Sequence, residues 1–340
     1  MGSRFLLSKA DLCATIHMYI SYSRFAVCVF VRSAVKVLNF GSLNIDYVYR
    51  VPHFVKGGET LSSASLNIFS GGKGLNQSVA LARAGMDVYH AGNIGEDGIF
   101  LLEELREAGV NTCLVTLHGD VRTGHAIIQN DLQGDNCILL YGGANQSVTP
   151  SQVESVFAGF GERDLLVLQN EINDLPLIIS KAREKGMLIC LNPSPMSESL
   201  YPLIPQADYL LLNEIEAAQY LDHLDIPAGG SGLEARLSKA LPSSMIVLTL
   251  GENGCVWIHG GEIVRQPAFK VDAVDTTAAG DTFTGFFLAG ITSGMTLEQA
   301  LEYASYAAAL AVSRPGASPS IPTAQEVNAG LAHSKPGPER

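Results

Sequence analysis

Basic residues are scarce in this chain of 340 amino acids. It holds 22 Lys and Arg against 34 Asp and Glu, which gives a formal net charge of −12. Binding to nucleic acid or to an acidic membrane surface depends on clustered Lys and Arg, so the composition argues against both kinds of partner. A phosphate-bearing ligand would have to be met locally, by backbone N–H groups or by a metal ion.

The cysteines form no recognisable site. Six are present, but they lie far apart and include no Cys-x-x-Cys pair. This spacing favours neither a zinc site nor a disulfide framework. We expect reduced and mostly buried thiols.

A long apolar run is also lacking. The apolar stretch near the N-terminus, residues 16–31, is interrupted by Arg24 and is too short to cross a bilayer. It has no clear small-residue cleavage site, so a signal peptide is the less favoured interpretation. We expect residues 1–34 to lie outside the fold, as an added segment, a misassigned start or a disordered extension. Residues 331–340 are expected to form a tail, and the expected location is the cytoplasm.

Two common nucleotide-binding fingerprints are missing. The first predicted strand ends in FGSLNID, without the G-x-G-x-x-G that an NAD-dependent dehydrogenase of the doubly wound type would show. The run SGGKGLNQ at 70–77 holds a Gly pair and Lys73, but it is not a Walker A loop. Taken alone, the Gly pair is typical of a structural turn, and Lys73 of a solvated surface residue.

Apolar strands and amphipathic helices alternate from residue 35 onward. VKVLNFG, DLLVLQ, MLICLN, ADYLLLN and MIVLTLG have the composition of buried strands, each followed by a turn or a helix. This alternation predicts an α/β fold in which helices cover both faces of a mostly parallel sheet. Ligands of such sheets bind beyond the carboxyl ends of the strands. We expect the polar residues that follow the strands to share one rim: Asn44, Asp46, Asn170, Glu171, Asn192, Asn213, Glu216, Thr249 and Gly251.

Two segments break this alternation. Residues 47–70 and 123–142 show strand-like alternation with turn residues between, and no helical period. We expect them to pair as a small antiparallel sheet beside an α/β domain formed by 35–46, 71–122 and 143–330. That sheet could be an edge extension of the core sheet or a lid; the lid is favoured because loops at this rim commonly gate ligands. Its exposed apolar face would also favour a homodimer.

The most informative run is DTTAAGDTFTG at 275–285. Small residues lead into a helix-like stretch, so several backbone N–H groups are left unpaired and point at one spot, which suits an anion. Asp281 stands among them and could take a proton beside a bound phosphate. A plain helix N-cap is the alternative role for Asp281.

Four stretches together resemble the ribokinase-type carbohydrate kinases, a family that includes fructokinases, adenosine kinases and B-type phosphofructokinases. They are GSLNID at 41–46, GGKGLNQ at 71–77, LLLNEIEA at 210–217 and VDTTAAGDTFTG at 274–285. The resemblance spans about residues 37–322 and implies a three-layer α/β/α sandwich with a β lid. It also implies phosphoryl transfer from ATP to a sugar hydroxyl, with Asp281 as the base. The N–H groups of Ala278, Ala279 and Gly280 would stabilise the charge on the transferred group.

The resemblance implies two sets of ligand contacts. The sugar would be held by Asn44, Asp46, Gly72, Lys73, Gly74, Asn76 and Glu171. The nucleotide would be held by Asn213, Thr249, Gly251, Glu252, Gly254, Gly280 and Ser305. Ser305 departs from the bulkier polar residue often found at its position.

Two cations are implied as cofactors beside ATP. Glu216 would help to hold Mg²⁺ through water, and a solvated helix residue is the alternative. A potassium ion would bind, largely through carbonyl oxygens, at Asp275, Thr277, Ala311, Arg314, Gly316 and Ser320. The alternative for residues 311–320 is an ordinary Pro/Gly loop.

Within the family, the resemblance of GSLNID and GGKGLNQ implies ribose as the substrate, ahead of another pentose or a ketohexose. Deoxyribose, fructose, 2-keto-3-deoxygluconate and a nucleoside stay open, whereas no Arg cluster is evident for a sugar phosphate. The alternative from another class is a silent sugar-binding regulator on the same fold. Such a protein normally loses the base or the glycine of the anion site, and both Gly280 and Asp281 are present here.

Overall fold

The computed structural model of the chain describes residues 35–226 and 232–334. The expectation for residues 1–34 therefore lies outside the described residues, as does most of the predicted tail. Residues 331–334, assigned to that tail, are the end of helix α9 (Ala324–Ser334).

A nine-stranded sheet lies at the centre of the fold, in the order β13-β12-β11-β10-β9-β8-β1-β4-β5. The strands from β11 to β5 run parallel, and β12 and β13 are added antiparallel at one edge. The predicted mostly parallel sheet is thus confirmed. The strands are β1 Lys36–Phe40, β4 Asp87–Gly95, β5 Asn111–His118, β8 Leu165–Gln169, β9 Leu188–Asn192, β10 Tyr209–Asn213, β11 Met245–Thr249, β12 Cys255–His259 and β13 Glu262–Gln266.

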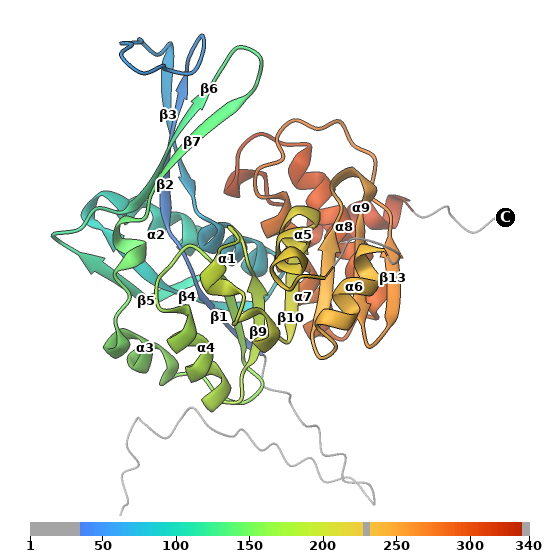
Figure 1. The fold of residues 1–340 in the computed structure, drawn as a ribbon. Helices are drawn as coiled ribbons and strands as arrows, with labels where there is room; N and C mark the ends of the chain where they lie inside the picture. The colour runs from blue at the N-terminus through green and yellow to red at the C-terminus, as the bar shows by residue number, and fades with distance from the viewer. Residues whose placement is uncertain (1–34, 227–231, 335–340) are drawn as a thin grey trace, which may run out of the picture. The chain divides into compact units, whose positions relative to one another are not determined.

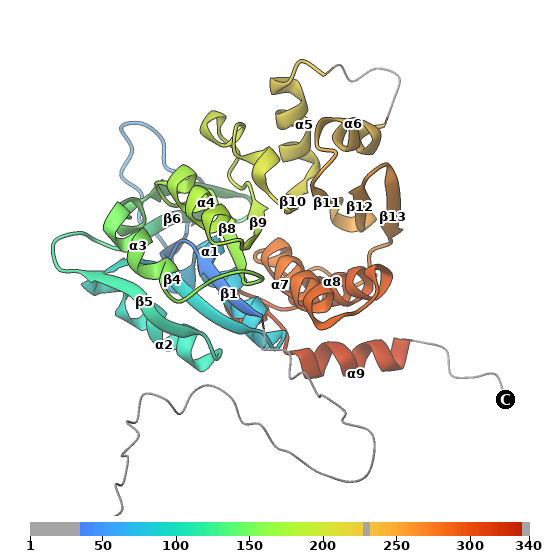
Figure 2. The same ribbon diagram turned by 90° about the horizontal axis from the view of Figure 1, so that it is seen from below.

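Helices cover both faces of this sheet (Figure 2). In β8, Leu165 and Val167 pack into one apolar layer, and Leu166 and Leu168 pack into the other. Burial on both faces explains why the central strands are apolar throughout rather than alternating. One layer holds α1 Lys73–Arg83, α2 Ile99–Glu107, α7 Ala279–Ser293, α8 Leu297–Val312 and α9; the other holds α3 Pro150–Phe157, α4 Leu175–Glu184, α5 Glu214–His223 and α6 Leu233–Ala240.

The strand order reverses between β1 and β8. From β1 the chain builds β4 and β5 on one side, and it later returns to build β8, β9, β10 and β11 on the other. In open α/β sheets the crevice outside the carboxyl ends of the strands at such a switch point binds ligands. The segments that leave β1 and β8, residues 41–44 and 170–171, flank this crevice.

A separate four-stranded sheet stands away from the nine-stranded one (Figure 1). It has the order β3-β2-β6-β7, with β2 Asn44–Arg50, β3 Ser65–Gly71, β6 Gly124–Asn130 and β7 Asn136–Tyr141. Its independence from the core sheet rules out the edge extension.

The expected all-antiparallel pairing of this small sheet needs one correction. Its outer pairs, β2–β3 and β6–β7, are antiparallel, but the central pair β2–β6 is parallel. The pairing starts at Asn44 with Gly124 and ends at Arg50 with Asn130. Both strands therefore leave the rim of the α/β body in the same direction, which makes their pairing parallel.

The four cysteines in the described part of the chain differ in exposure. Cys190 and Cys255 are buried, whereas Cys113 and Cys137 are exposed. The expectation of mostly buried thiols is therefore wrong for the latter two, which lie on edge strands with an uncovered face. Among the residues described, no helix combines the length and apolar character needed to span a bilayer.

Candidate active site

The glycines of GGKGLNQ let three chain segments meet at the crevice. Gly72 precedes α1 with φ 93°, a conformation that favours glycine. A Cβ at Gly74 would lie 2.6 Å from the carbonyl carbon of Gly41 and closer still to the backbone N of Ser42. A Cβ at Gly71 would collide with the carboxylate of Asp46. The run is thus a structural turn, as its composition suggests, and it also brings polar groups together.

Two carboxylates and one ammonium group share this crevice. Glu171 follows β8, and its Oε2 accepts hydrogen bonds from the Ser42 hydroxyl and, at 3.0 Å, from the backbone N–H of Lys73. Burial raises the pKa of Glu171 despite these donors. Burial and the nearby charge of Glu171 raise the pKa of Asp46 to about 6. Burial opposes the charged form of Lys73, but the carboxylates of Asp281, Glu171 and Glu216 outweigh it and raise the pKa of Lys73.

Asp281 lies in the first turn of α7 and is only 7% exposed. Its Oδ2 accepts a hydrogen bond from Asn76 Nδ2 at 3.0 Å, and its Oδ1 accepts one from Gln77 Nε2 at 2.9 Å. The N-cap of α7 is Ala278, and no side chain caps this helix. The carboxylate of Asp281 is therefore held by α1, and the N-cap alternative is wrong.

The turn before Asp281 has the geometry of an anion site. Ala278 adopts the left-handed region, with φ 61° and ψ 6°, which is uncommon for a residue with a Cβ. Ala279 donates to Thr276 O over a long 3.3 Å. Within the described chain, Gly280 and Asp281 have no backbone acceptor for their N–H groups. The start of α7 thus presents donors and the positive end of a helix beside a carboxylate.

The residues predicted for the nucleotide lie further along the same rim. Asn213 caps α5 in a capping box with Glu216, whose Oε2 accepts the Asn213 N–H at 3.0 Å. Asn213 pairs with Thr249 in the β10–β11 register. Gly251 and Glu252 form an exposed 3-10 turn after β11, and Gly254 has φ 94°. Ser305, on α8, is buried, with its Oγ 3.7 Å from Cys255 Sγ.

Two of the predicted potassium residues, Thr277 and Gly316, donate backbone N–H groups to the carboxylate of a third, Asp275. Asp275 Oδ1 accepts the Thr277 N–H at 2.9 Å, and its Oδ2 accepts the Gly316 N–H at 3.1 Å. Partial burial disfavours the charged form, but these two donors outweigh it and lower the pKa of Asp275. Ala311 turns the chain by accepting the Arg314 N–H, and Ser320 Oγ donates to Ala317 O at 2.7 Å. The ionised carboxylate of Asp275 is one oxygen ligand that a hard monovalent cation could use at this loop. The side chain of Arg314 points instead to Glu326, at 2.7 Å.

Three residues of the site were missed by sequence reasoning. Ser42 binds Glu171, Gln77 binds Asp281, and Asn145 donates to Asn44 Oδ1 at 2.7 Å. The only signal for Gln77 was its place directly after Asn76 in the motif GGKGLNQ, which does not show what its amide contacts. Asn145 had none, because it lies in a short 3-10 turn (Gly143–Gln146) far away in sequence.

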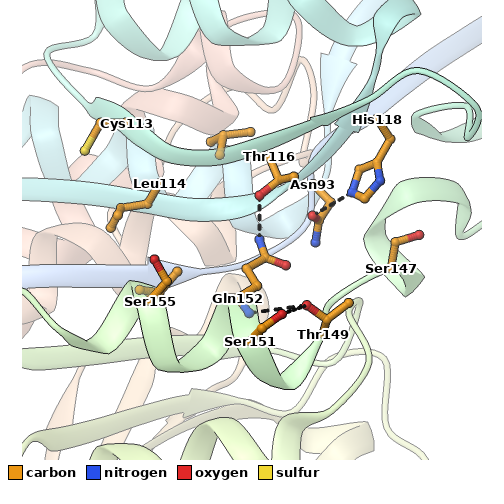
Figure 3. Close-up of a pocket in the computed structure, with 12 residues that line it drawn as sticks. Asn93, Cys113, Leu114, Thr116, His118, Ser147, Thr149, Ser151, Gln152 and Ser155 are labelled. Atoms are coloured by element: carbon orange, nitrogen blue, oxygen red, sulfur yellow. Dashed lines mark hydrogen bonds between the residues drawn. The ribbon is translucent and has the colours of Figure 1, made fainter.

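A cavity of about 380 Å³ lies elsewhere, between β4, β5 and α3 (Figure 3). Gln152 Nε2 donates to Thr116 Oγ1 at 3.1 Å, and His118 Nε2 lies 2.9 Å from Asn93 Oδ1. Apart from His118, the lining contains no acidic or basic side chain. It therefore lacks the charged groups that the crevice combines.

The crevice thus combines the parts needed for phosphoryl transfer. Unpaired N–H groups at a helix start can stabilise negative charge, and an adjacent buried carboxylate can accept a proton. Carboxylates and amides on the other side suit a ligand rich in hydroxyl groups.

The raised pKa of Asp46 makes a prediction about stability. Because this pKa is about 6 in the folded protein against 3.8 ordinarily, the native state holds the proton more tightly, and stability falls as pH rises from about 4 to 6. Asp46→Asn should therefore raise the free energy of unfolding by roughly 1–2 kcal/mol at pH 7.5 and by much less at pH 4. Urea denaturation at both values measures this. Asp120→Asn, at an exposed position, is the control; an equal gain at both pH values would contradict the prediction.

Known proteins are similar to this chain over most of its length. Residues 35–324 match the model of the pfkB family carbohydrate kinases. A ribokinase of Schizosaccharomyces pombe is 36% identical over 308 residues, covering 86% of this chain and 97% of the relative. The crystal structure of a ribokinase from Thermotoga maritima has a TM-score of 0.80 at 32% identity, covering 88% of this chain and 99% of that one. The Arabidopsis thaliana ribokinase complexed with ribose and ATP has a TM-score of 0.79 at 28% identity, covering 88% and 99%. The chain belongs to the pfkB family of carbohydrate kinases.

Proposed function

We propose that this protein is an ATP-dependent ribokinase, which converts D-ribose and ATP to D-ribose 5-phosphate and ADP. The observation that carries the proposal is the placement of Asp281, a buried carboxylate held by two amide donors at an anion-binding helix start. Similarity to proteins named ribokinases, one of them bound to ribose and ATP, supports the choice of sugar and phosphoryl donor.

Asp281 acts as the general base in this proposal. The primary hydroxyl of the sugar attacks the γ-phosphorus while its proton passes to Asp281, and the bond to the departing ADP breaks. The N–H groups of Ala278, Ala279 and Gly280 stabilise the charge on the transferred group. Most of the catalysis then comes from positioning and from fixed dipoles, as expected for phosphoryl transfer.

The acidic half of the crevice selects a neutral sugar. Asp46 and Glu171 accept hydrogen bonds from sugar hydroxyls, while Asn44, Lys73 and Asn76 complete the contacts, with Gly72 and Gly74 allowing close approach. A sugar that already carries a phosphate would be repelled by the two carboxylates. Burial first, and then the charge of Glu171, raise the pKa of Asp46. A sugar without the matching hydroxyl would leave a buried polar group unpaired.

ATP and two cations complete the proposal. Asn213, Thr249, Gly251, Glu252, Gly254 and Ser305 face or support the nucleotide. Glu216 holds Mg²⁺ through water; only its Oε2 is used in the capping box, which leaves Oε1 for that role. The ion supplies charge neutralisation on the phosphates. Use of ATP and the presence of free thiols favour a cytoplasmic location.

The base assignment predicts the effect of one isosteric change. Asp281→Asn keeps the size of the side chain but cannot accept the proton, so kcat should fall by roughly 10²–10⁴-fold. The KM values for ribose and ATP should stay within a few fold. A coupled assay of ADP formation measures both constants, with Asp120→Asn as the control. Near-normal turnover of Asp281→Asn would show that the base is another residue.

The same assay tests the choice of sugar. Ribose, deoxyribose, fructose, adenosine and fructose phosphates are compared as acceptors, and ribose should give the highest kcat/KM. Turnover with fructose but not with ribose would overturn the substrate and leave the kinase assignment standing. No turnover with any acceptor would favour the silent regulator.

We further propose that potassium binds at Asp275 and the loop of residues 311–320. The ion would steady the turn before Asp281, because Asp275 is already bonded to both Thr277 and Gly316. Replacing sodium by potassium at constant ionic strength should raise kcat several-fold. Asp275→Asn should remove the difference between the two ions. Equal rates of the unaltered enzyme in both salts would contradict this site.

The small sheet is proposed to act as a lid and as the contact of a homodimer. Its outer strands expose Leu66, Ile68 and Leu139 on one face and Ile138 and Leu140 on the other, each at least 46% accessible. Exposed apolar side chains gathered on one small sheet are usually covered. Leu139→Asp should raise the dimer dissociation constant at least tenfold in light scattering or sedimentation, whereas Leu177→Asp, on α4, should not. An unchanged oligomeric state of Leu139→Asp would argue against this interface.

A further inference from the structure

A chain of buried amides runs beneath the candidate base. Gln169 and Gln77 are at most 1% exposed, and Asn39 is fully buried. Gln169 Nε2 donates to Gln77 Oε1 at 2.6 Å and to Asn39 Oδ1 at 3.0 Å. Gln77 Nε2 in turn donates to Asp281 Oδ1. Three amides in an otherwise apolar layer are costly to bury unless they are bonded to each other.

The direction of this chain is set by a backbone carbonyl. Asn39 Nδ2 donates to Gly74 O at 2.7 Å, and a carbonyl oxygen can only accept. Asn39 must therefore turn its oxygen toward Gln169, which must turn its nitrogen toward Gln77. The Gln77 oxygen is taken, so its N–H group is left to face Asp281.

A second carbonyl fixes the same orientation independently. Asn192 Nδ2 donates to Leu211 O at 2.9 Å, so Asn192 Oδ1 is directed at Gln77 Nε2, 3.3 Å away. Both anchors require the Gln77 nitrogen on the side of Asp281. If the amide turned over, its oxygen would meet the oxygens of both Asn192 and Asp281.

We propose, on the basis of the proposed kinase function, that Gln77 is a positioning residue whose amide, oriented by Gln169 and Asn192, holds Asp281 as an ionised and correctly aimed base. Gln77 donates to one oxygen of Asp281 while Asn76 donates to the other. Both donors favour the carboxylate over the carboxylic acid. Accepting both bonds also fixes the rotation of the carboxylate, so its free lone pairs face the crevice.

Several charged groups surround Asp281. The charge of Asp281 contributes to the raised pKa of Lys73 on α1 and of Glu171 after β8. Glu216 on α5 and Asp46 on β2 act on Lys73 and Glu171 respectively. At the other end of the row of amides, Asn39 donates to Ser78, and Ser78 is bonded to His90. His90 is neutral because burial lowers its pKa to about 4. None of these titratable groups is changed in the variants below.

The first test replaces the hydrogen-bond donor that faces Asp281 by an acceptor. Gln77→Glu places a second carboxylate against Asp281 Oδ1, and two carboxylates at this distance share one proton. We expect kcat at pH 7 to fall at least roughly 30-fold and the acidic limb of the profile of kcat against pH to move up by more than about one pH unit. Gln77→Met only removes the hydrogen-bond donor. It should move the acidic limb of the kcat profile to higher pH as well, but by a smaller amount than Gln77→Glu does. KM for ribose should change less than about threefold in both.

The second test removes the two residues that orient the Gln77 amide, Gln169 and Asn192. Because either residue alone can orient this amide, Gln169→Met and Asn192→Leu should each lower kcat by less than about threefold. The double variant should lower kcat by more than about tenfold. Ser78→Ala is the matched control: Ser78 is buried and bonded to Asn39, but Gly74 O orients Asn39 without it. It should lower the melting temperature and leave the acidic limb in place.

The outcomes separate this inference from the proposed function. An inactive Asp281→Asn together with an unmoved acidic limb in both Gln77 variants would overturn the positioning role alone. If the loss of kcat in the double variant equalled the product of the losses in Gln169→Met and Asn192→Leu, the claim that two carbonyls independently orient Gln77 would be overturned. Near-normal turnover of Asp281→Asn would overturn the base itself. If Gln77→Glu fails to fold, Gln77→Met and the double variant of Gln169 and Asn192 still test the positioning role of Gln77.

Discussion

The contact between α1 and α7 is the constraint on which the site depends. A Cβ at Gly285 would lie 2.7 Å from the carbonyl carbon of Ala80, so the two helices approach as closely as their backbones allow. This approach brings Asn76 and Gln77 on one helix within hydrogen-bond reach of Asp281 on the other. The motifs GGKGLNQ and DTTAAGDTFTG, some 200 residues apart in sequence, become one site through this contact. The electrostatics of the crevice follow from it, since Asp281 is among the charges that keep Lys73 protonated.

Much of the fold was predictable because its signals are local and repeated. Burial on both faces makes each central strand continuously apolar, and a parallel sheet then follows from the helices between the strands. The rim was predictable for the same reason, since parallel strands end at one edge. The parallel pairing of β2 with β6 was not, because strand direction depends on where each segment leaves the body and not on its own pattern.

Some of the residues around Asp281 could also be predicted from the sequence, and others could not. Asp281 and Asn76 stand in motifs with a recognisable composition and were found. Gln77 stands beside Asn76, yet nothing in its neighbours says that its amide meets a carboxylate from residue 281. Asn39 looks like a single polar interruption of an apolar strand, and Gln169 like the polar end of one. Their role emerges only when the carbonyl of Gly74, which orients Asn39, and the carbonyl of Leu211, which orients Asn192, are placed in space.

One further cluster joins β3 of the small sheet, helix α1 and the loop of residues 311–320. Ser70, in β3, lies 3.2 Å from Ser318 Oγ, and Ser318 also donates to Glu104. Arg83, at the end of α1, donates to the carbonyls of Ser318 and Ile321. These groups are largely buried, so a shift of the loop of residues 311–320 cannot be absorbed by solvent. The bonds to Ser70, Arg83 and Glu104 would pass such a shift to β3, α1 and α2. An ion that orders this loop would therefore act on β3 of the small sheet and on α1, the helix that holds Asp281. It would do so even though none of the residues expected to bind the ion is among those expected to bind the sugar.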